Sequence, residues 1–183
     1  FTGSLLGNIN GSSSYATSAS YALTSSYASN GVTNLGVGTF YDTTTQTLAT
    51  GASASMTLNT PVIQDGVIVA SNSRITVSRT GIYNLQFSAQ VQTTVGGSPD
   101  VHIWLRKNGT DVTYSNTGIS IQNQNQKYVG AWNFVESLIA GDYLELVWYV
   151  DGGASAQLVA EIAAPANGGV GVPSVIVTMT LIK

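Results

Sequence analysis

Hydrophobic and polar residues alternate along the chain after about residue 36, which predicts β-strands rather than helices. The clearest run is 82–92, where five apolar residues from Tyr83 to Val91 share one face and Asn, Gln and Ser side chains share the other. Residues 101–106 alternate in the same way and lead to Asn108-Gly109. This dipeptide best accommodates the positive φ angles of a tight hairpin turn, so another strand is expected from about Thr110.

Further strands are expected at 40–48, 67–69, 74–77, 128–135, 143–150 and 174–182. About eight to ten strands without a convincing helix predict an all-β fold, a β-sandwich or jelly roll.

Two of these segments, 143–150 and 174–182, are apolar on both faces. One domain covers only one face of such a strand, so the second face predicts contact with neighbouring subunits. The alternative is a central strand that the loops of its own chain cover. The candidate subunit-interface residues are Val147, Tyr149, Val175, Val177 and Met179.

The first 35 residues differ from the rest of the chain. The triplet Ser-Tyr-Ala recurs every six residues, at 14–16, 20–22 and 26–28. A step of six scatters residues around a helix but places them on one face of an extended strand, which favours an extended, oligomeric fibrous stalk. A flexible Ser-rich linker is the alternative. We therefore divide the chain into a stalk or linker, 1–35, and a head domain, 36–183.

Charge is scarce, because only 8% of residues are charged and the formal net charge is −3. A surface built from Ser, Thr, Asn, Gln and Gly offers little grip on phosphate, so nucleic acid is not expected as a partner. No long apolar stretch predicts a membrane partner, and no cysteine is present to form a disulfide or bind a metal. The chain begins at Phe1 without a basic and apolar leader, so we expect further sequence upstream.

Three motifs occur in an order that resembles the complement/tumour-necrosis-factor-like trimeric jelly roll, over residues 38–183. They are Arg79-Thr80-Gly81-Ile82-Tyr83, Leu105-Arg106-Lys107-Asn108-Gly109 and Leu138-Ile139-Ala140-Gly141-Asp142-Tyr143. This resemblance implies a homotrimer with parallel three-fold packing. The chain lacks the collagen-like Gly-x-y stalk of some relatives.

A second resemblance concerns the two ends of the chain. Residues 1–7, the Ser-Tyr-Ala repeats and the ending Pro173-Ser174-Val175-Ile176-Val177-Thr178 are similar to C-terminal regions of fibre and virion structural proteins of tailed phages. The resemblance implies a virion protein that contacts other virion proteins upstream of its stalk.

Residues that could perform chemistry are few. His102 is the only histidine, and the nine acidic residues are scattered without an obvious facing pair or an acidic loop. Catalysis by a serine triad or a glycosidase pair, and binding of a metal or cofactor, are therefore not expected. His102, Trp104 and Arg106 share the polar face of one strand and are the candidate surface or receptor contacts.

The expected function is that of a non-enzymatic, trimeric bacteriophage fibre protein, located on the virion as a head or tail fibre. Its distal head would attach to a host-surface glycan or protein, or would decorate the capsid or tail. A bacterial surface-layer or spore-coat trimer is the alternative, and a glycan-degrading enzyme comes last.

Overall fold

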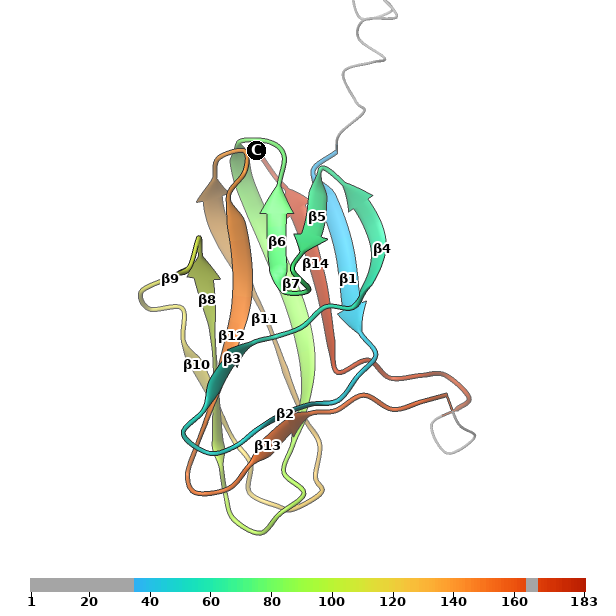
Figure 1. The fold of residues 1–183 in the computed structure, drawn as a ribbon, viewed down its shortest axis with the longest axis vertical. Helices are drawn as coiled ribbons and strands as arrows, with labels where there is room; N and C mark the ends of the chain where they lie inside the picture. Colours follow the sequence, from blue (N-terminus) through green and yellow to red (C-terminus); the bar gives the residue numbers. More distant parts are fainter. Residues whose placement is uncertain (1–34, 164–167) are drawn as a thin grey trace, which may run out of the picture. The chain divides into compact units, whose positions relative to one another are not determined.

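A computed structural model describes residues 35–163 and 168–183, which lie in the unit Asn34–Lys183. All helices and strands assigned within these ranges are β-strands, packed as two sheets (Figure 1). This confirms the predicted all-β sandwich. The predicted stalk, apart from Leu35, lies outside the described residues.

The first sheet has seven strands, and its neighbouring strands pair antiparallel. Its order is β2 (Gln46–Leu48), β13 (Ala156–Leu158), β7 (Gly81–Gln92), β14 (Val175–Leu181), β1 (Val37–Asp42) and β4 (Thr60–Asp65), and β11 (Tyr128–Leu138) also pairs with β7. Edge positions therefore fall to β2, β4 and β11, each of which pairs with a single strand. Pro61 in β4 fits this arrangement, because proline has no backbone N–H to donate to the ladder and is therefore tolerated on edge strands.

The second sheet also has seven strands. Its order is β10 (Thr117–Ser120), β8 (Asp100–Lys107), β12 (Tyr143–Asp151), β6 (Arg74–Val77) and β5 (Val67–Ala70), and β3 (Ser53–Ser55) pairs with β12 while β9 (Thr110–Asp111) pairs with β8.

The core lies between the two sheets. The predicted apolar row of β7, from Tyr83 to Val91, is buried there together with Leu146 and Trp148 of β12. The ring of Phe87 packs edge-on against Trp132 of β11, with a centroid distance of 4.7 Å. Burying an aromatic or large aliphatic side chain contributes about 1.5–3 kcal/mol. The alternation read from the sequence thus identifies the core face of β7.

Two turns show how local chemistry positions the strands. Asn108 and Gly109 have φ angles of 49° and 81° and join β8 to β9, as predicted. The single strand expected at 40–48 is instead broken after Asp42, because its carboxylate accepts hydrogen bonds from the Thr44 backbone N–H at 2.7 Å and the Thr57 hydroxyl at 2.7 Å. The chain therefore turns between β1 and β2.

The two-sided strands require a correction. Val175, Val177 and Met179 are fully covered within the core of one chain, at 0% exposure, so the prediction that their face of β14 meets a neighbouring subunit is wrong. Val147 is also covered by its own chain, at 0%, as the alternative interpretation of a central strand proposed. Tyr149 is half-buried and lies on the outward face of the second sheet.

Candidate functional site

The outward face of the second sheet carries the three predicted contact residues. His102, Trp104 and Arg106 alternate with core residues of β8, so their side chains point away from the core. Across the ladder to β12, His102 lies opposite Tyr149 and Trp104 lies opposite Val147. The two strands therefore place a histidine, a tryptophan and a tyrosine side by side on one surface.

Loop residues complete a cleft of about 400 Å³ at this place. The imidazole of His102 and the ring of Tyr149 lie 6.0 Å apart between centroids, and Nδ1 of His102 is 3.5 Å from the amide nitrogen of Asn116. We call this site the aromatic cleft. It is lined by His102, Trp104, Asp111, Val112, Asn116 and Tyr149.

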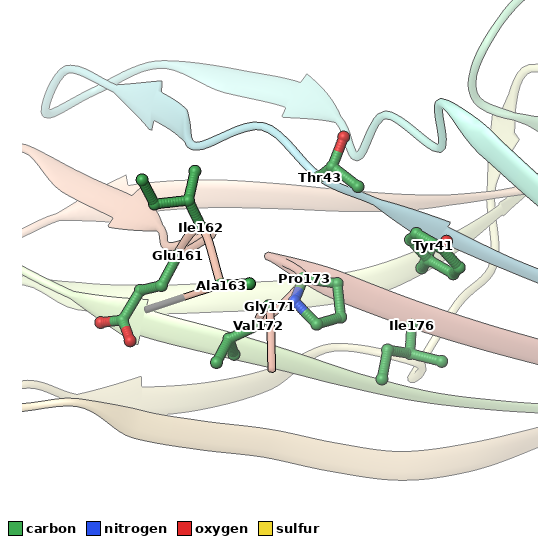
Figure 2. Close-up of a pocket in the computed structure, with 9 residues that line it drawn as sticks. All are labelled: Tyr41, Thr43, Glu161, Ile162, Ala163, Gly171, Val172, Pro173 and Ile176. Carbon is green, nitrogen blue, oxygen red and sulfur yellow. The ribbon is translucent and has the colours of Figure 1, made fainter. Parts of the chain in front are cut away.

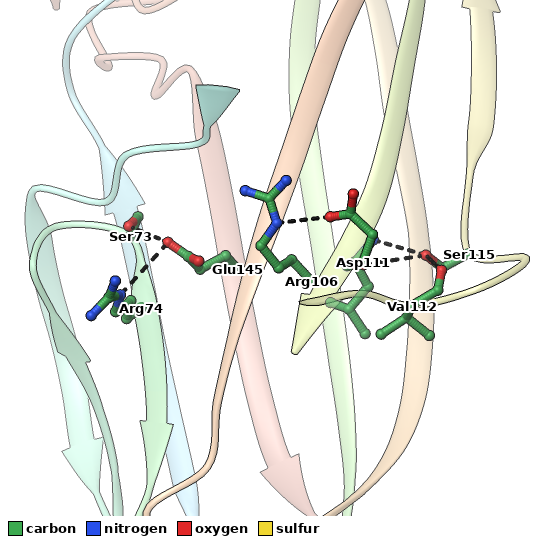
Figure 3. Close-up of polar contacts among 8 residues, drawn as sticks. Ser73, Arg74, Arg106, Asp111, Val112, Ser115 and Glu145 are labelled. Atoms are coloured by element: carbon green, nitrogen blue, oxygen red, sulfur yellow. Dashed lines mark hydrogen bonds and ion pairs between the residues drawn. The ribbon is translucent and has the colours of Figure 1, made fainter. Parts of the chain in front are cut away.

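Charges at the cleft are paired. Arg106 donates to the Asp111 carboxylate at 2.7 Å, an interaction that the β8–β9 hairpin brings together (Figure 3). This hydrogen bond lowers the pKa of Asp111 below its ordinary value, and the Trp104 side chain lowers the pKa further. The carboxylate is therefore ionised at neutral pH, with its charge balanced by Arg106.

After Asp111 the chain forms a short loop, which is held by hydrogen bonds of the Ser115 hydroxyl. The Ser115 hydroxyl donates to the carbonyl oxygen of Val112 at 2.8 Å and accepts from the backbone N–H of Leu105 at 3.0 Å. These bonds hold the loop that carries Val112 and Ser115 against β8 (Figure 3). The wall of the cleft is thus fixed by hydrogen bonds between the Ser115 hydroxyl and the backbone.

A second group of polar contacts lies further along the same face. Glu145 is only 7% exposed, accepts a hydrogen bond from the Ser73 hydroxyl at 2.8 Å and lies 4.0 Å from the Arg74 guanidinium (Figure 3). Arg74 also lies over the ring of Tyr143, 4.7 Å from its centroid. These groups satisfy one another and connect β6 to β12.

The first sheet has a different concave surface, which we call the apolar hollow. Its volume is about 550 Å³, and it lies beside Tyr41 and Ile176, which face each other across β1 and β14. Figure 2 shows the remaining side chains around it. They are Thr43, Glu161, Ile162, Ala163, Gly171, Val172 and Pro173.

The outward face and edges of the first sheet expose several apolar side chains. Ile176 of β14 is 40% exposed, and Val129 and Val135 on edge strand β11 are 64% and 54% exposed. Val62 and Ile63 on the opposite edge strand, β4, are 57% and 45% exposed. On β14, the face predicted from the sequence to be the subunit interface is therefore the core face. Ile176 lies on the opposite, outward face.

Groups that could hold a metal ion, with three or more His, Cys, Asp or Glu side chains, do not occur among the described residues. No helix in the same part of the chain is long and apolar enough to cross a membrane. The absence of an enzymatic activity stays a prediction.

Sequence reasoning found two of the six residues that line the aromatic cleft. It grouped His102 with Trp104 but placed Tyr149 in the subunit-interface set. Asp111 could have been found, because a two-residue hairpin at Asn108-Gly109 pairs Arg106 with Asp111. Asn116 comes from a loop whose path the strand pattern does not determine.

Comparisons with known proteins agree on the fold. The sequence matches no family model and no curated protein. Among solved structures, Eiger TNF from S. frugiperda is 11% identical with a TM-score of 0.57, over 80% of this chain and 92% of that chain. Murine APRIL at pH 5.0 is 14% identical with a TM-score of 0.50, over 80% of this chain and 98% of that one.

The globular domain of zebrafish complement 1qA is 11% identical with a TM-score of 0.49, over 81% of this chain and 98% of that chain. Identities this low show the fold alone. The described domain therefore has a jelly-roll fold similar to those of Eiger TNF and murine APRIL, which confirms the jelly roll that the sequence motifs implied.

Proposed function

We propose that this chain is a non-enzymatic, homotrimeric fibre protein of a bacteriophage virion, with the jelly-roll domain as its attachment head. The observation that supports a trimer is the exposed apolar surface of the first sheet, on Ile176 of β14 and on edge strands β4 and β11. Exposed apolar side chains and open strand edges favour association, because they leave hydrophobic surface and backbone groups uncovered.

A homotrimer is also what the sequence resemblance to the complement/tumour-necrosis-factor-like jelly roll implies. Copies packed around a three-fold axis would cover the outward face of the first sheet in each chain. The second sheet, with its paired charges and its aromatic cleft, would remain on the outside. The two faces of the sandwich would then divide assembly and attachment between them.

Support for a fibre on a virion comes from the sequence. The period-six Ser-Tyr-Ala repeats suit several identical extended strands, and a content of 8% charged residues suits a protein that works without charge steering. Electron microscopy of phage particles labelled with an antibody against the chain tests this location. Particles that carry no label would contradict it.

Sedimentation equilibrium of the whole chain tests the trimer. We expect about three times the chain mass of 19.0 kDa. Ile176→Asp should abolish the trimer, because an unpaired charge buried at each of three interfaces costs several kcal/mol. Ile68→Asp is the matched control, since Ile68 is 47% exposed on β5 of the other sheet.

A wild-type chain that is monomeric at micromolar concentration would refute the trimer. If Ile176→Asp and Val135→Asp both remain trimeric, the trimer forms through another surface. Trimers of Ile68→Asp together with monomers of Ile176→Asp would support the proposed face.

A further inference from the structure

We propose that the aromatic cleft binds a neutral saccharide. The inference rests on the proposed attachment function and names its ligand class. The cleft has a volume of about 400 Å³, within the range of about 300–1,000 Å³ that small-molecule sites occupy. Its lining residues come from β8, β9, β12 and the loop between β9 and β10.

The floor of the cleft is suited to a sugar ring. Trp104 and Tyr149 are half-buried on adjacent strands, so their rings are held by the sheet while part of each side chain remains open to the cleft. The Nε1 atom of Trp104 is covered, which leaves ring carbon as the exposed part of the indole. A pyranose has a face of C–H groups that packs on such aromatic carbon, while Val112 adds an aliphatic wall.

The rim supplies polar groups for the hydroxyls that surround a pyranose. The Asn116 side chain is exposed and offers both an N–H donor and a carbonyl acceptor. The Asp111 carboxylate has 54% of its side-chain surface exposed and has acceptor capacity beyond its bond to Arg106. An apolar floor with a few convergent polar groups at its edge is the usual composition of a specific ligand site.

Charge decides between a neutral and an acidic saccharide. Arg106 lies beside the cleft, opposite the lining residue Asp111, and is already bound to that carboxylate at 2.7 Å. An anionic sugar would have to compete with this carboxylate and would meet its charge directly. A neutral saccharide leaves the pair intact and hydrogen-bonds to its outer atoms.

The test uses the whole chain and a panel of immobilised neutral oligosaccharides ending in glucose, galactose, mannose or N-acetylglucosamine, printed beside sialylated and sulfated ones. We expect binding to one or more neutral members. Tyr149→Ala and Asn116→Ala should each weaken that binding by about tenfold or more, as loss of an aromatic anchor or a key polar group does. Tyr114→Asn is the matched control: Tyr114 is fully exposed, two residues from Asn116, outside the cleft, and at a φ of 63° that asparagine tolerates.

Trp104→Ala is a stronger perturbation of the floor, and its melting temperature and that of Tyr149→Ala are measured alongside binding. The proposal would be overturned if the wild-type chain bound no neutral saccharide or bound only the acidic ones. It would also be overturned if the Tyr149→Ala and Asn116→Ala variants bound neutral saccharides as well as wild type does. Sedimentation of the same samples separates the two hypotheses. A trimer without sugar binding refutes the saccharide site alone, and a sugar-binding monomer refutes the trimer alone.

Discussion

Asp142 connects two turns, and replacing it tests how far a single carboxylate stabilises the jelly roll. Its Oδ2 accepts from the backbone N–H of Ile139 at 3.0 Å and lies 3.2 Å from the Lys107 ammonium. Its Oδ1 accepts from the side-chain amide of Asn108 at 2.8 Å. The β8–β9 and β11–β12 turns are therefore held together by one side chain.

Asp142→Asn should lower the free energy of unfolding by about 2 kcal/mol, since one hydrogen bond to a charged group contributes about 1.5–3 kcal/mol. The new amide group cannot satisfy both sides. If it faces Ile139 and Lys107, donors meet donors; if it faces Asn108, the two amides conflict. Asn108 cannot simply rotate, because its oxygen accepts from the Tyr143 backbone N–H at 2.9 Å.

Thermal unfolding followed by circular dichroism at one fixed protein concentration measures this loss. A change of about 2 kcal/mol corresponds to roughly 4–8 °C for a domain of this size, at about 2–4 °C per kcal/mol. Fixed concentration matters, because association shifts the apparent stability. Asp65→Asn provides the control for the same change in charge at the end of another strand.

The pH dependence gives a second and independent result. The pKa of Asp142 is lowered below its ordinary value, most by the hydrogen bond from the backbone N–H of Ile139 and less by Asn108 and Lys107. A lowered folded-state pKa means that the stabilisation is present above the ordinary pKa of about 4 and is lost as the pH falls through the folded value. The difference between wild type and Asp142→Asn should thus be constant from pH 7 to 5 and shrink below about pH 4. A difference that is absent at pH 7, or unchanged at pH 2, would refute this reasoning.

Two further results are expected. Gly152→Ala should lower the melting temperature more than Gly153→Ala: both have a φ of 83°, but only a Cβ at Gly152 would meet a backbone atom, the Ser98 oxygen at 2.9 Å. Equal melting temperatures in calorimetry would contradict this. Treatment with EDTA should change neither the mass in sedimentation nor the melting temperature, because no cluster of three metal-ligating side chains occurs among the described residues. A fall of more than about 5 °C would reveal a metal site.

Local patterns in the sequence predicted much of the fold. The alternation of 82–92 gave strand β7 and its core face, and Asn108-Gly109 gave the β8–β9 hairpin, because side-chain period and turn conformation depend on neighbouring residues alone. The break after Asp42 was missed, although one of its hydrogen bonds, from Thr44, is local; the other comes from Thr57, which is distant in sequence.

The choice of the buried face was harder to predict for strands that are apolar on both sides. In β14, Thr178 and Thr180 follow Ile176 on the outward face, and this polar pair was a usable signal that the other face is the core. For Val147 no such signal exists. It is covered where β12 lies between Trp104 of β8 and Ser55 of β3, and the short sequence of β3 does not predict a strand.

The opposite positions of the two surfaces lead to a prediction that involves both proposals. Ile176 lies on the outward face of the first sheet, whereas the aromatic cleft lies on the outward face of the second sheet. A trimer closed through the first sheet would present three separate clefts, and linked sites increase binding to a multivalent surface by about 10²–10⁴-fold over one site.

Ile176→Asp should therefore keep the affinity of wild type for a soluble neutral oligosaccharide, because the substitution leaves every residue of the cleft unchanged. On a surface densely coated with the same oligosaccharide, its apparent affinity should fall by about 10²–10⁴-fold, since a monomer has one site. NMR titration measures the first quantity, and surface plasmon resonance at low and high coating density measures the second. Weaker binding of the soluble sugar would mean that the cleft is shared between subunits, and an unchanged affinity on the dense surface would mean that a single cleft already accounts for attachment.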